Sequence, residues 1–264
     1  MPKSKIHTLA IVHPKARLAP DVEVGPASSI GKGVSIGSGT TIAANVFITG
    51  ETKIGKNNKI FSGAVIGTEP QDLKFHGEKT FLEIGDNNTI REHVTIHRGS
   101  ASGIGKTTIG SNCFLMVSSH IAHDCHIGNS VGMTNLTSLG GHVTIGDEAW
   151  IGGMVGIHHF VTVGKLAFIG GYSKVVKDVP PFMLADGRPT KIRGLNIVGL
   201  KRAKFSDAQI SILKKAYQLL YRSKLNISQA LERIECEVEK TSEIVELIGF
   251  IKDTPNGRMG RSRG

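Results

Sequence analysis

Six of the eleven histidines fall within one stretch of forty residues, and Asp124 directly follows one of them, His123. A histidine poised near neutral pH is the usual general base, and an adjacent carboxylate can fix its tautomer or stabilise its imidazolium. Gly141 has no side chain, so its backbone N–H can approach a developing oxyanion. These groups together predict acyl transfer to a hydroxyl. The six histidines are His120, His123, His126, His142, His158 and His159.

A six-residue repeat must position these groups, because an aliphatic residue recurs at every sixth position through most of the chain. The series runs through residues 12–66, 84–96 and 109–175, and glycine often follows the aliphatic residue. This period predicts a parallel β-helix, in which three short strands form one triangular coil of about eighteen residues. A coil cannot bury its apolar side chains alone, so stacked coils share one narrow core. The aromatic content of only 5% fits such a core.

An eighteen-residue coil determines which side chains become neighbours. It places Asp124 beside His142, and His123 beside Gly141, along one edge of adjacent coils. This convergence favours a functional site over isolated surface histidines. Cys125 would offer a thiol nucleophile instead, but it takes the fifth position of its repeat, where side chains point into the core. We therefore expect Cys125 to be buried and inert.

The repeat is interrupted twice and then gives way to helical patterning. Insertions in a solenoid emerge as surface loops and often supply binding residues. After Val175 a loop is expected, and then helices capped by Ser206, Ser228 and Thr241. The predicted units are a β-helical domain (1–195) with inserted loops at about 72–83 and 100–108, an α-helical domain (196–253) and a tail expected to be disordered (254–264).

The charge balance favours an acidic partner, since 32 basic against 22 acidic residues give a net charge of +10. No recognised nucleic-acid-binding motif accompanies this charge, so no nucleic-acid partner is expected. Three cysteines without metal-ligand spacing favour a reducing, cytoplasmic location. The N-terminus lacks the apolar core of a signal peptide, and no stretch is long enough to span a membrane. Stable membrane insertion is therefore not expected.

Five short motifs resemble the UDP-N-acetylglucosamine O-acyltransferases that begin lipid A biosynthesis. Many acyltransferases share hexapeptide repeats, whereas these motifs together are specific to one family. The resemblance covers the repeat, both insertions and the helical region. The motifs are residues 66–74 (IGTEPQDLK), 96–99 (IHRG), 120–125 (HIAHDC), 151–154 (IGGM) and 196–202 (NIVGLKR).

The resemblance implies a mainly β fold, a left-handed parallel β-helix followed by a small α-helical domain, in a homotrimer with active sites between subunits. It implies transfer of a 3-hydroxyacyl group from acyl carrier protein to the 3-position of UDP-N-acetylglucosamine, without a cofactor or a metal. His123 matches the general base of the family, Asp124 its neighbour and Gly141 the oxyanion amide. The residues that match the substrate site are Asp72, Lys74, His97, His120, His142, Gly153, His158, Asn196 and Arg202.

Three further positions bear on specificity. Val198 stands where an acidic residue is common in the family, and Ala203 where a second arginine is common, so the uridine and phosphate contacts differ from the usual pattern. Gly171 matches the position that closes the far end of the acyl-chain groove. Because a glycine leaves that groove open, we expect a preference for longer 3-hydroxyacyl donors.

Three alternatives differ in the reaction. The acceptor could be a 3-amino UDP-sugar, because some relatives are expected to acylate an amine. A zinc hydratase of the carbonic anhydrase type can use the same solenoid with histidine ligands, but the Asp124 carboxylate beside His123 and the sugar motifs argue against it. A non-catalytic scaffold would predict that His123→Ala changes nothing measurable. The sequence favours the acyltransferase.

Overall fold

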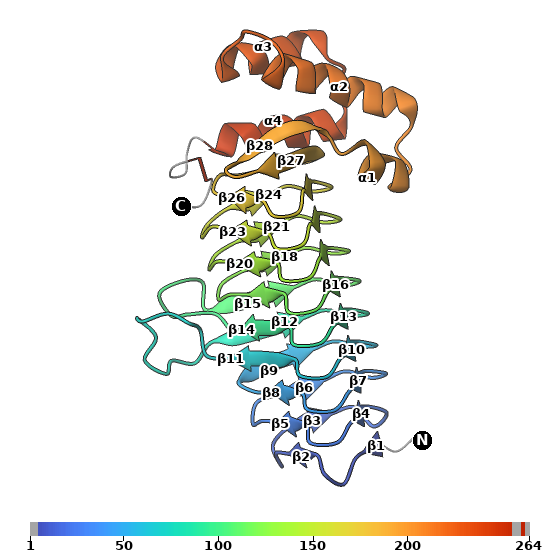
Figure 1. Cartoon of the computed structure of the whole chain (residues 1–264), viewed down its shortest axis with the longest axis vertical. Coiled ribbons are helices and arrows are strands. Elements are labelled where there is room, and N and C mark those ends of the chain that lie inside the picture. The colour runs from blue at the N-terminus through green and yellow to red at the C-terminus, as the bar shows by residue number, and fades with distance from the viewer. Residues whose placement is uncertain (1–4, 255–259, 262–264) are drawn as a thin grey trace.

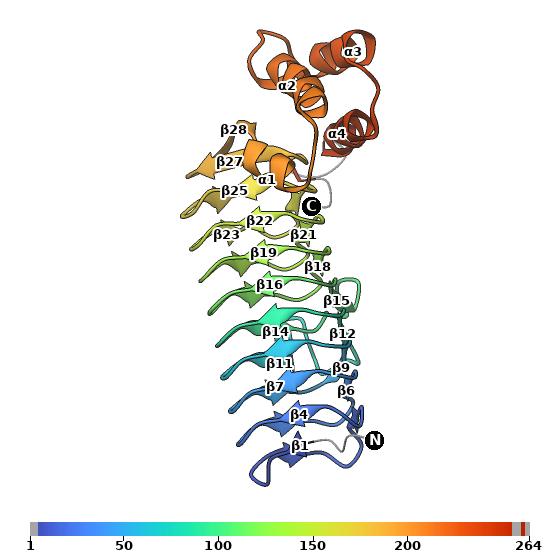
Figure 2. The same ribbon diagram turned by 90° about the vertical axis from the view of Figure 1, so that its right-hand side faces the viewer.

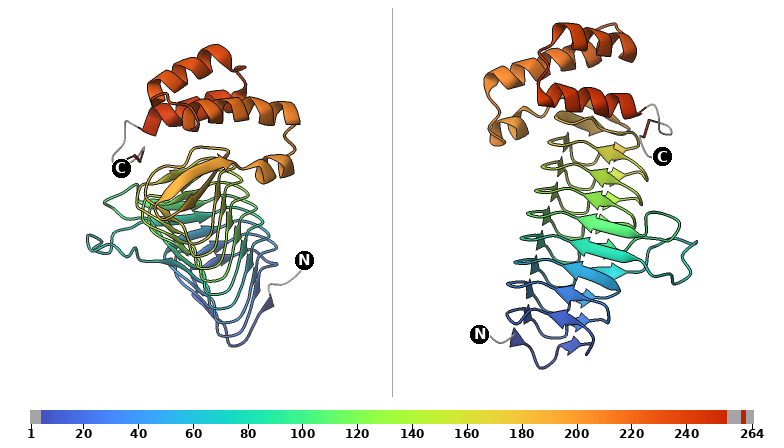
Figure 3. Two further views of the ribbon diagram at one scale, coloured as in Figure 1. Left: turned by 45° about the horizontal axis from the view of Figure 1, so that its top comes forward. Right: turned by 180° about the vertical axis from the view of Figure 1, so that it is seen from behind.

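The computed structural model describes residues 5–254, 260 and 261, and it has the shape of a long prism with helices at its C-terminal end (Figure 1). Three parallel sheets form the three faces of the prism, and the view toward its end shows the triangular winding of the chain (Figure 3, left). Through the prism, strands pair with strands three places along the chain, so three strands make one coil. The predicted β-helix followed by helices is confirmed for the described residues.

The strands are mostly two residues long, and each sheet holds one strand per coil. The first sheet contains β1 (Lys5–Ile6), β4 (Glu23–Val24), β7 (Thr41–Ile42), β10 (Lys59–Ile60), β13 (Thr89–Ile90), β16 (Phe114–Leu115), β19 (Gly132–Met133), β22 (Trp150–Ile151), β25 (Phe168–Ile169), β27 (Met183–Gly187) and β28 (Thr190–Leu195). The second contains β2 (Ile11–Val12), β5 (Ser29–Ile30), β8 (Phe47–Ile48), β11 (Val65–Thr68), β14 (Thr95–His97), β17 (His120–Ile121), β20 (Ser138–Leu139), β23 (Gly156–Ile157) and β26 (Lys174–Val175). The third contains β3 (Arg17–Leu18), β6 (Ser35–Ile36), β9 (Glu51–Ile54), β12 (Phe81–Ile84), β15 (Lys106–Ile109), β18 (His126–Ile127), β21 (Thr144–Ile145) and β24 (Thr162–Val163).

The core of the prism is the column of aliphatic residues that the repeat predicts. Ile30, Ile66, Ile121 and Ile157 are at most 3% exposed, and each pairs with an aliphatic residue of the coil above or below. Burying one such side chain contributes about 1.5–3 kcal/mol. The stacked core therefore keeps the coils in register and positions whatever residues the corners carry.

Two insertions leave the prism on the same side (Figures 1 and 3). The first, residues 69–80, joins β11 to β12, and the second, residues 98–105, joins β14 to β15. The predicted ends at 83 and 108 are too late. Both following strands are four residues long and pair along their whole length, so Leu82 and Thr107 add a second buried position ahead of the usual one.

The C-terminal region packs on the last coils and forms a second apolar core with them (Figure 2). Its helices are α1 (Ile197–Arg202), α2 (Asp207–Tyr221), α3 (Ile227–Glu237) and α4 (Ser242–Asp253). Ser206 and Thr241 cap α2 and α4 as predicted. The prediction for α3 is wrong, since its cap is Asn226 and not Ser228.

Two further expectations about this region need correction. The loop expected after Val175 contains a hairpin, β27 and β28, whose first strand continues the first sheet beside β25. In the tail, the carbonyl of Gly260 accepts a hydrogen bond from the Asp178 N–H at 2.8 Å, and Arg261 is only 8% exposed. These two residues are packed, contrary to the expected disorder, and the other residues of 255–264 lie outside the described part. None of the helices in the described part has the length and apolar character needed to span a bilayer.

Candidate active site

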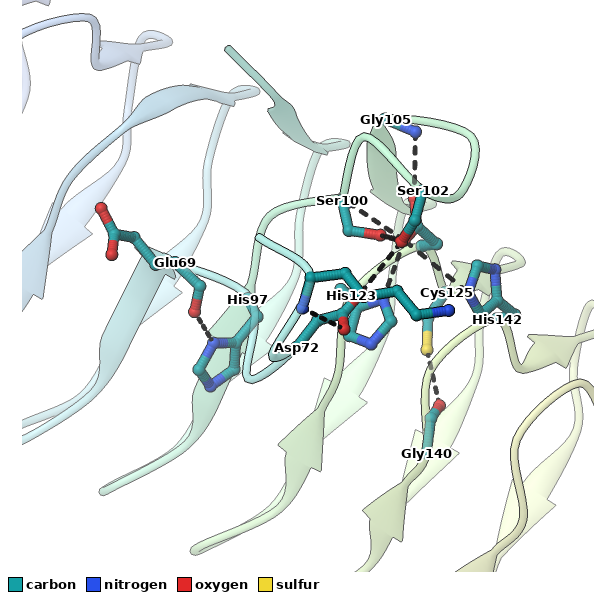
Figure 4. A network of polar contacts seen from close by, with 12 residues as sticks. Glu69, Asp72, His97, Ser100, Ser102, Gly105, His123, Cys125, Gly140 and His142 are labelled. Carbon is teal, nitrogen blue, oxygen red and sulfur yellow. Dashed lines mark hydrogen bonds and ion pairs between the residues drawn. The ribbon is translucent and has the colours of Figure 1, made fainter. Parts of the chain in front are cut away.

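His123 and Asp124 lie in the turn between β17 and β18, at the edge where the second sheet meets the third. Asp124 takes the left-handed corner conformation, with φ of 58°. Its carboxyl group is buried, and its Oδ2 lies 2.8 Å from Nδ1 of His123, whose side chain is 10% exposed (Figure 4). A His123 tautomer that donates from Nδ1 to this carboxylate leaves Nε2 free to accept a proton.

The second insertion supplies the other partners of the Asp124 carboxylate. Oδ2 accepts hydrogen bonds from the N–H and the hydroxyl of Ser100, at 3.0 and 2.8 Å, and Oδ1 accepts one from the Gly105 N–H at 3.0 Å. Burial alone would raise the pKa of Asp124. The hydrogen bonds from His123 and Ser100 outweigh burial and hold this pKa below its usual value. The carboxylate is therefore charged beside the imidazole.

Gly141 and His142 follow one coil later, as the register predicts. A side chain at Gly141 would lie 2.6 Å from Cε1 of His123, so only glycine fits here without displacing the ring. No hydrogen bond within the described residues uses the Gly141 N–H. Nε2 of His142 lies 3.9 Å from Oδ2 of Asp124, and the His142 ring stacks on the Phe160 ring with centroids 4.4 Å apart. Burial lowers the pKa of His142, and the Asp124 charge only partly opposes this.

Two predicted site histidines contact each other on the second sheet, His120 on β17 just before His123 and His97 at the end of β14, one coil earlier. The rings of His97 and His120 meet edge to face with centroids 5.2 Å apart. His97 bonds through Nδ1 to the Glu69 carbonyl, and His120 through Nδ1 to the Thr95 hydroxyl at 2.7 Å. Burial lowers the pKa of both rings, that of His120 to about 4, where His97 also contributes. His120 is therefore neutral near pH 7.

The first insertion reaches this site through Asp72. Its Oδ2 accepts a hydrogen bond from the Ser102 hydroxyl at 2.9 Å, and its Oδ1 accepts one from the Lys74 N–H at 3.0 Å. These bonds lower the pKa of Asp72. Lys74 is exposed on the same insertion. The structure thus joins the two insertions by a direct contact between Asp72 and Ser102.

Of the remaining predicted residues on the prism, His158 lies two coils beyond His123 at the same edge, whereas Gly153 and Gly171 lie where the first sheet meets the second. His158 contacts the ring of His159 and has Nη1 of Arg261 at 3.5 Å from its Nδ1. Gly153 and Gly171 stack directly, because a side chain at Gly171 would meet the Gly153 carbonyl at an ordinary contact distance of 3.4 Å. Both glycines therefore leave surface space that a side chain would fill.

Asn196 and Arg202 are not brought to His123 within one chain. They line a cavity of about 470 Å³ over the first sheet together with Trp150, Val198 and Ala203, and no histidine of the described residues lines it. Asn196 also caps α1, accepting from the Gly199 N–H and donating to the Leu166 carbonyl.

Three further residues qualify the sequence predictions. The predicted burial of Cys125 is confirmed, and burial raises its pKa to about 12, which disfavours a thiolate nucleophile. His126, grouped with the site histidines, lies on the third sheet and bonds Thr108. Ser100 and Ser102 contact the site carboxylates and were not predicted, because neither the repeat nor any motif spacing marks them.

The ligand atoms of His123, Asp124 and His142 lie within 4.8 Å of one another, a spacing that would suit a metal ion. The Asp124 carboxylate, however, already accepts hydrogen bonds on both oxygens from Ser100, Gly105 and His123. Donors from the protein therefore already satisfy the hydrogen-bonding capacity of this carboxylate. The cluster therefore fits a histidine base held by a carboxylate better than a set of metal ligands.

Comparisons with known proteins place the chain in a family. A family model described as Udp N-acetylglucosamine O-acyltransferase, Domain 2, matches residues 178–260. A Thermodesulfovibrio yellowstonii protein named acyl-(acyl-carrier-protein)–UDP-N-acetylglucosamine O-acyltransferase is 50% identical over 96% of this chain and 98% of its own length. The solved structure of LpxA from Acinetobacter baumannii is 43% identical, with a TM-score of 0.90 over 94% of this chain and 96% of that one. UDP-N-acetylglucosamine O-acyltransferase (LpxA) from Moraxella catarrhalis is 42% identical, with a TM-score of 0.91 over the same shares.

These likenesses cover both the prism and the helical region, and they confirm the left-handed form of the β-helix that the sequence motifs imply. The identities lie well above the level at which only a fold is shared. The chain therefore belongs to the family of UDP-N-acetylglucosamine O-acyltransferases, and it is an acyltransferase.

Proposed function

We propose that this protein transfers a 3-hydroxyacyl group from acyl carrier protein to the 3-hydroxyl of UDP-N-acetylglucosamine, the first step of lipid A biosynthesis. The observation that carries the proposal is the buried pair of His123 and Asp124, 2.8 Å apart, beside a glycine whose N–H has no acceptor among the described residues. The names of the relatives, which describe an acyl donor on acyl carrier protein and UDP-N-acetylglucosamine as acceptor, support it.

His123 is the general base in this proposal. Its Nε2 removes the proton of the sugar hydroxyl while that oxygen attacks the thioester carbonyl, so that a C–O bond forms. The C–S bond then breaks, and the imidazolium returns the proton to the departing thiolate. The products are the O-acylated sugar nucleotide and the free thiol of the carrier protein. Asp124 holds the Nδ1–H and stabilises the imidazolium between the two steps.

The Gly141 N–H is the proposed donor to the oxyanion of the tetrahedral intermediate. Its support is position, since the backbone at Gly141 lies so close to the His123 ring that a Cβ atom added there would come within 2.6 Å of it. A preorganised donor of this kind is typically worth about 10²- to 10³-fold in kcat. His142, whose pKa is lowered by burial, and His120 are neutral near pH 7 in this proposal and can therefore also accept hydrogen bonds from sugar hydroxyls.

The rest of the predicted substrate site divides between two surfaces. Asp72, Lys74 and His97 lie on the insertions and coils beside His123, whereas Asn196 and Arg202 line the cavity over the first sheet. A homotrimer would let that cavity of one subunit serve the His123 of its neighbour. We therefore propose that the assembly is a homotrimer with sites between subunits, and sedimentation of the purified chain tests it.

The acyl chain is proposed to run along the prism from His123 toward Gly153 and Gly171. Those two residues lie between one and three coils beyond the base, and a coil rises by roughly 4.8 Å. Neither carries a side chain that would stop the groove. This supports a preference for longer donors.

Mass spectrometry of the products tests the reaction. The purified chain is given UDP-N-acetylglucosamine or its 3-amino analogue, with a ladder of 3-hydroxyacyl carrier-protein thioesters. We expect an O-acylated product from UDP-N-acetylglucosamine. A product from the amine alone would assign the 3-amino sugar as acceptor, and the absence of any acylated sugar nucleotide would reject the proposed function. Metal analysis of the active protein tests the zinc alternative.

A further inference from the structure

We propose that Ser100, at the base of the second insertion, is a positioning residue that holds the Asp124 carboxylate and, through it, orients the His123 base. This rests on the proposed function, in which His123 removes the proton of the acceptor. The resemblance to the family gave the base and its carboxylate neighbour, and it assigned no role to the second insertion.

The hydrogen bonds of the carboxylate support the role of Ser100. Asp124 accepts four of them within the described residues, and Ser100 donates two, both to the oxygen that contacts His123. Hydrogen bonds to a charged acceptor are about twice as strong as neutral ones. Ser100→Ala would remove the hydroxyl bond and leave Oδ2 with the backbone N–H of residue 100 and the His123 ring, so the carboxylate would be held less firmly against the imidazole.

The backbone of the insertion packs directly on the same groups. A side chain at Gly103 would lie 2.5 Å from Cγ of Asp124 and 2.6 Å from Cε1 of His142. A side chain at Gly99 would lie 2.0 Å from the backbone nitrogen of Lys106, so the two ends of the insertion are in contact. Only glycine permits such approaches. The second insertion thus packs closely over the carboxylate as a cover, and the Asp124 side chain has no exposed surface.

The second insertion is also held in place by the first insertion. The Ser102 hydroxyl lies 3.1 Å from that of Ser100 and donates to Asp72 of the first insertion at 2.9 Å. A chain of contacts therefore leads from the first insertion through both serines to Asp124 and His123. Figure 4 shows Asp72, Ser102, Ser100 and His123 gathered at this place. This chain explains why a segment without repeat or motif signal contacts the site so closely.

The test compares Ser100→Ala with a matched control. Ser38→Ala removes the same kind of bond, from the Ser38 hydroxyl to Asp21 at 2.6 Å, in an early coil of the prism. Both variants are assayed for acyl transfer, and the full-length proteins are labelled with ¹⁵N-histidine so that NMR reports which His123 nitrogen carries the proton. The His123 resonance is assigned by its loss in His123→Gln.

For Ser100→Ala we expect kcat to fall about 10-fold or more, KM for both substrates to stay within about twofold, and His123 to change from the Nδ1–H form to a mixture of tautomers. Ser38→Ala should match the parent in all three. An unchanged kcat, or a lower kcat with the parental His123 tautomer, overturns the role of Ser100. Failure of the parent itself to acylate would instead reject the proposed function, while the NMR comparison would still test the positioning.

Discussion

Gly141→Ala is the substitution whose effect follows most directly from the geometry. The added methyl carbon would lie 2.6 Å from Cε1 and 2.7 Å from Nε2 of His123, where ordinary contact begins at 3.4 Å. The ring must therefore move by about 0.8 Å, although its Nδ1 is bonded to the buried Asp124 carboxylate. A displacement of about 1 Å at a reacting group can cost about 10²-fold in rate. We expect kcat to fall by that factor, equivalent to about 2.7 kcal/mol.

The assay measures kcat with saturating substrates, together with the thermal midpoint of the variant. Alanine keeps the backbone N–H, so a loss of activity reports the position of His123 and not the removal of an oxyanion donor. Gly249→Ala is the control, because a side chain there meets nothing within 4 Å and the residue lies within helix α4. It should leave kcat unchanged. Parental kcat in Gly141→Ala would refute the close packing of Gly141 on the base.

Three other predictions rest on separate features. Burial, with a smaller effect of His97, lowers the folded-state pKa of His120 from 6.5 to about 4, so its contribution to stability is complete above pH 6.5 and is lost toward pH 4, where the unfolded chain takes up the proton first. His120→Gln should therefore lose less free energy of unfolding than the parent over this pH range, by on the order of 1–2 kcal/mol in urea titrations, and an equal loss would argue against a buried neutral His120. Gly171→Met should shift the donor preference toward shorter chains, at about 0.8 kcal/mol per excluded methylene, and an unchanged chain-length profile would make Gly171 purely structural. Turnover with acyl carrier protein should fall as the salt concentration rises, because exposed Lys201 and Arg202 attract an acidic partner. Turnover of a neutral acyl-pantetheine should not depend on salt, and equal salt dependence of the two donors would argue against a basic docking surface.

The prism could be predicted from the sequence because each six-residue unit encodes its own inward side chain. Stacked coils differ by one fixed number of residues, so the same count that places Ile121 under Leu139 also places His123 by Gly141 and Asp124 by His142. Contacts between residues far apart in the chain are normally hidden from sequence analysis. A solenoid exposes them through its period.

The insertions have no such repeat, so the contacts that their residues make could not be predicted from the sequence. The bonds from Ser100 to Asp124 and from Ser102 to Asp72 span 24 and 30 residues and depend on how two irregular segments fold together. The glycines at positions 99 and 103 were the available signal, since close backbone approach requires glycine. A glycine-rich insertion beside a predicted site is therefore better interpreted as a cover than as a tolerated loop.

The errors in the helical region have local causes. Asn226 and Ser228 are both good cap residues, but only Asn226 has a glutamine three positions later, Gln229, and the reciprocal bonds of the capping box form there. The hairpin of β27 and β28 was interpreted as a loop because Gly187 and Pro189 are turn residues. Pro189 does lie in the turn, but Gly187 ends β27, and the flanking strands form because β27 can extend the first sheet beside β25.

The most direct test of the central claim is the turnover of His123→Ala with UDP-N-acetylglucosamine and a 3-hydroxyacyl carrier protein. His93→Ala is the control, since His93 is an exposed corner residue of an earlier coil. If His123 removes the acceptor proton, its loss should lower kcat by about 10²-fold or more, with thermal midpoint and assembly unchanged. Near-parental turnover by a folded His123→Ala protein would remove this residue from the mechanism.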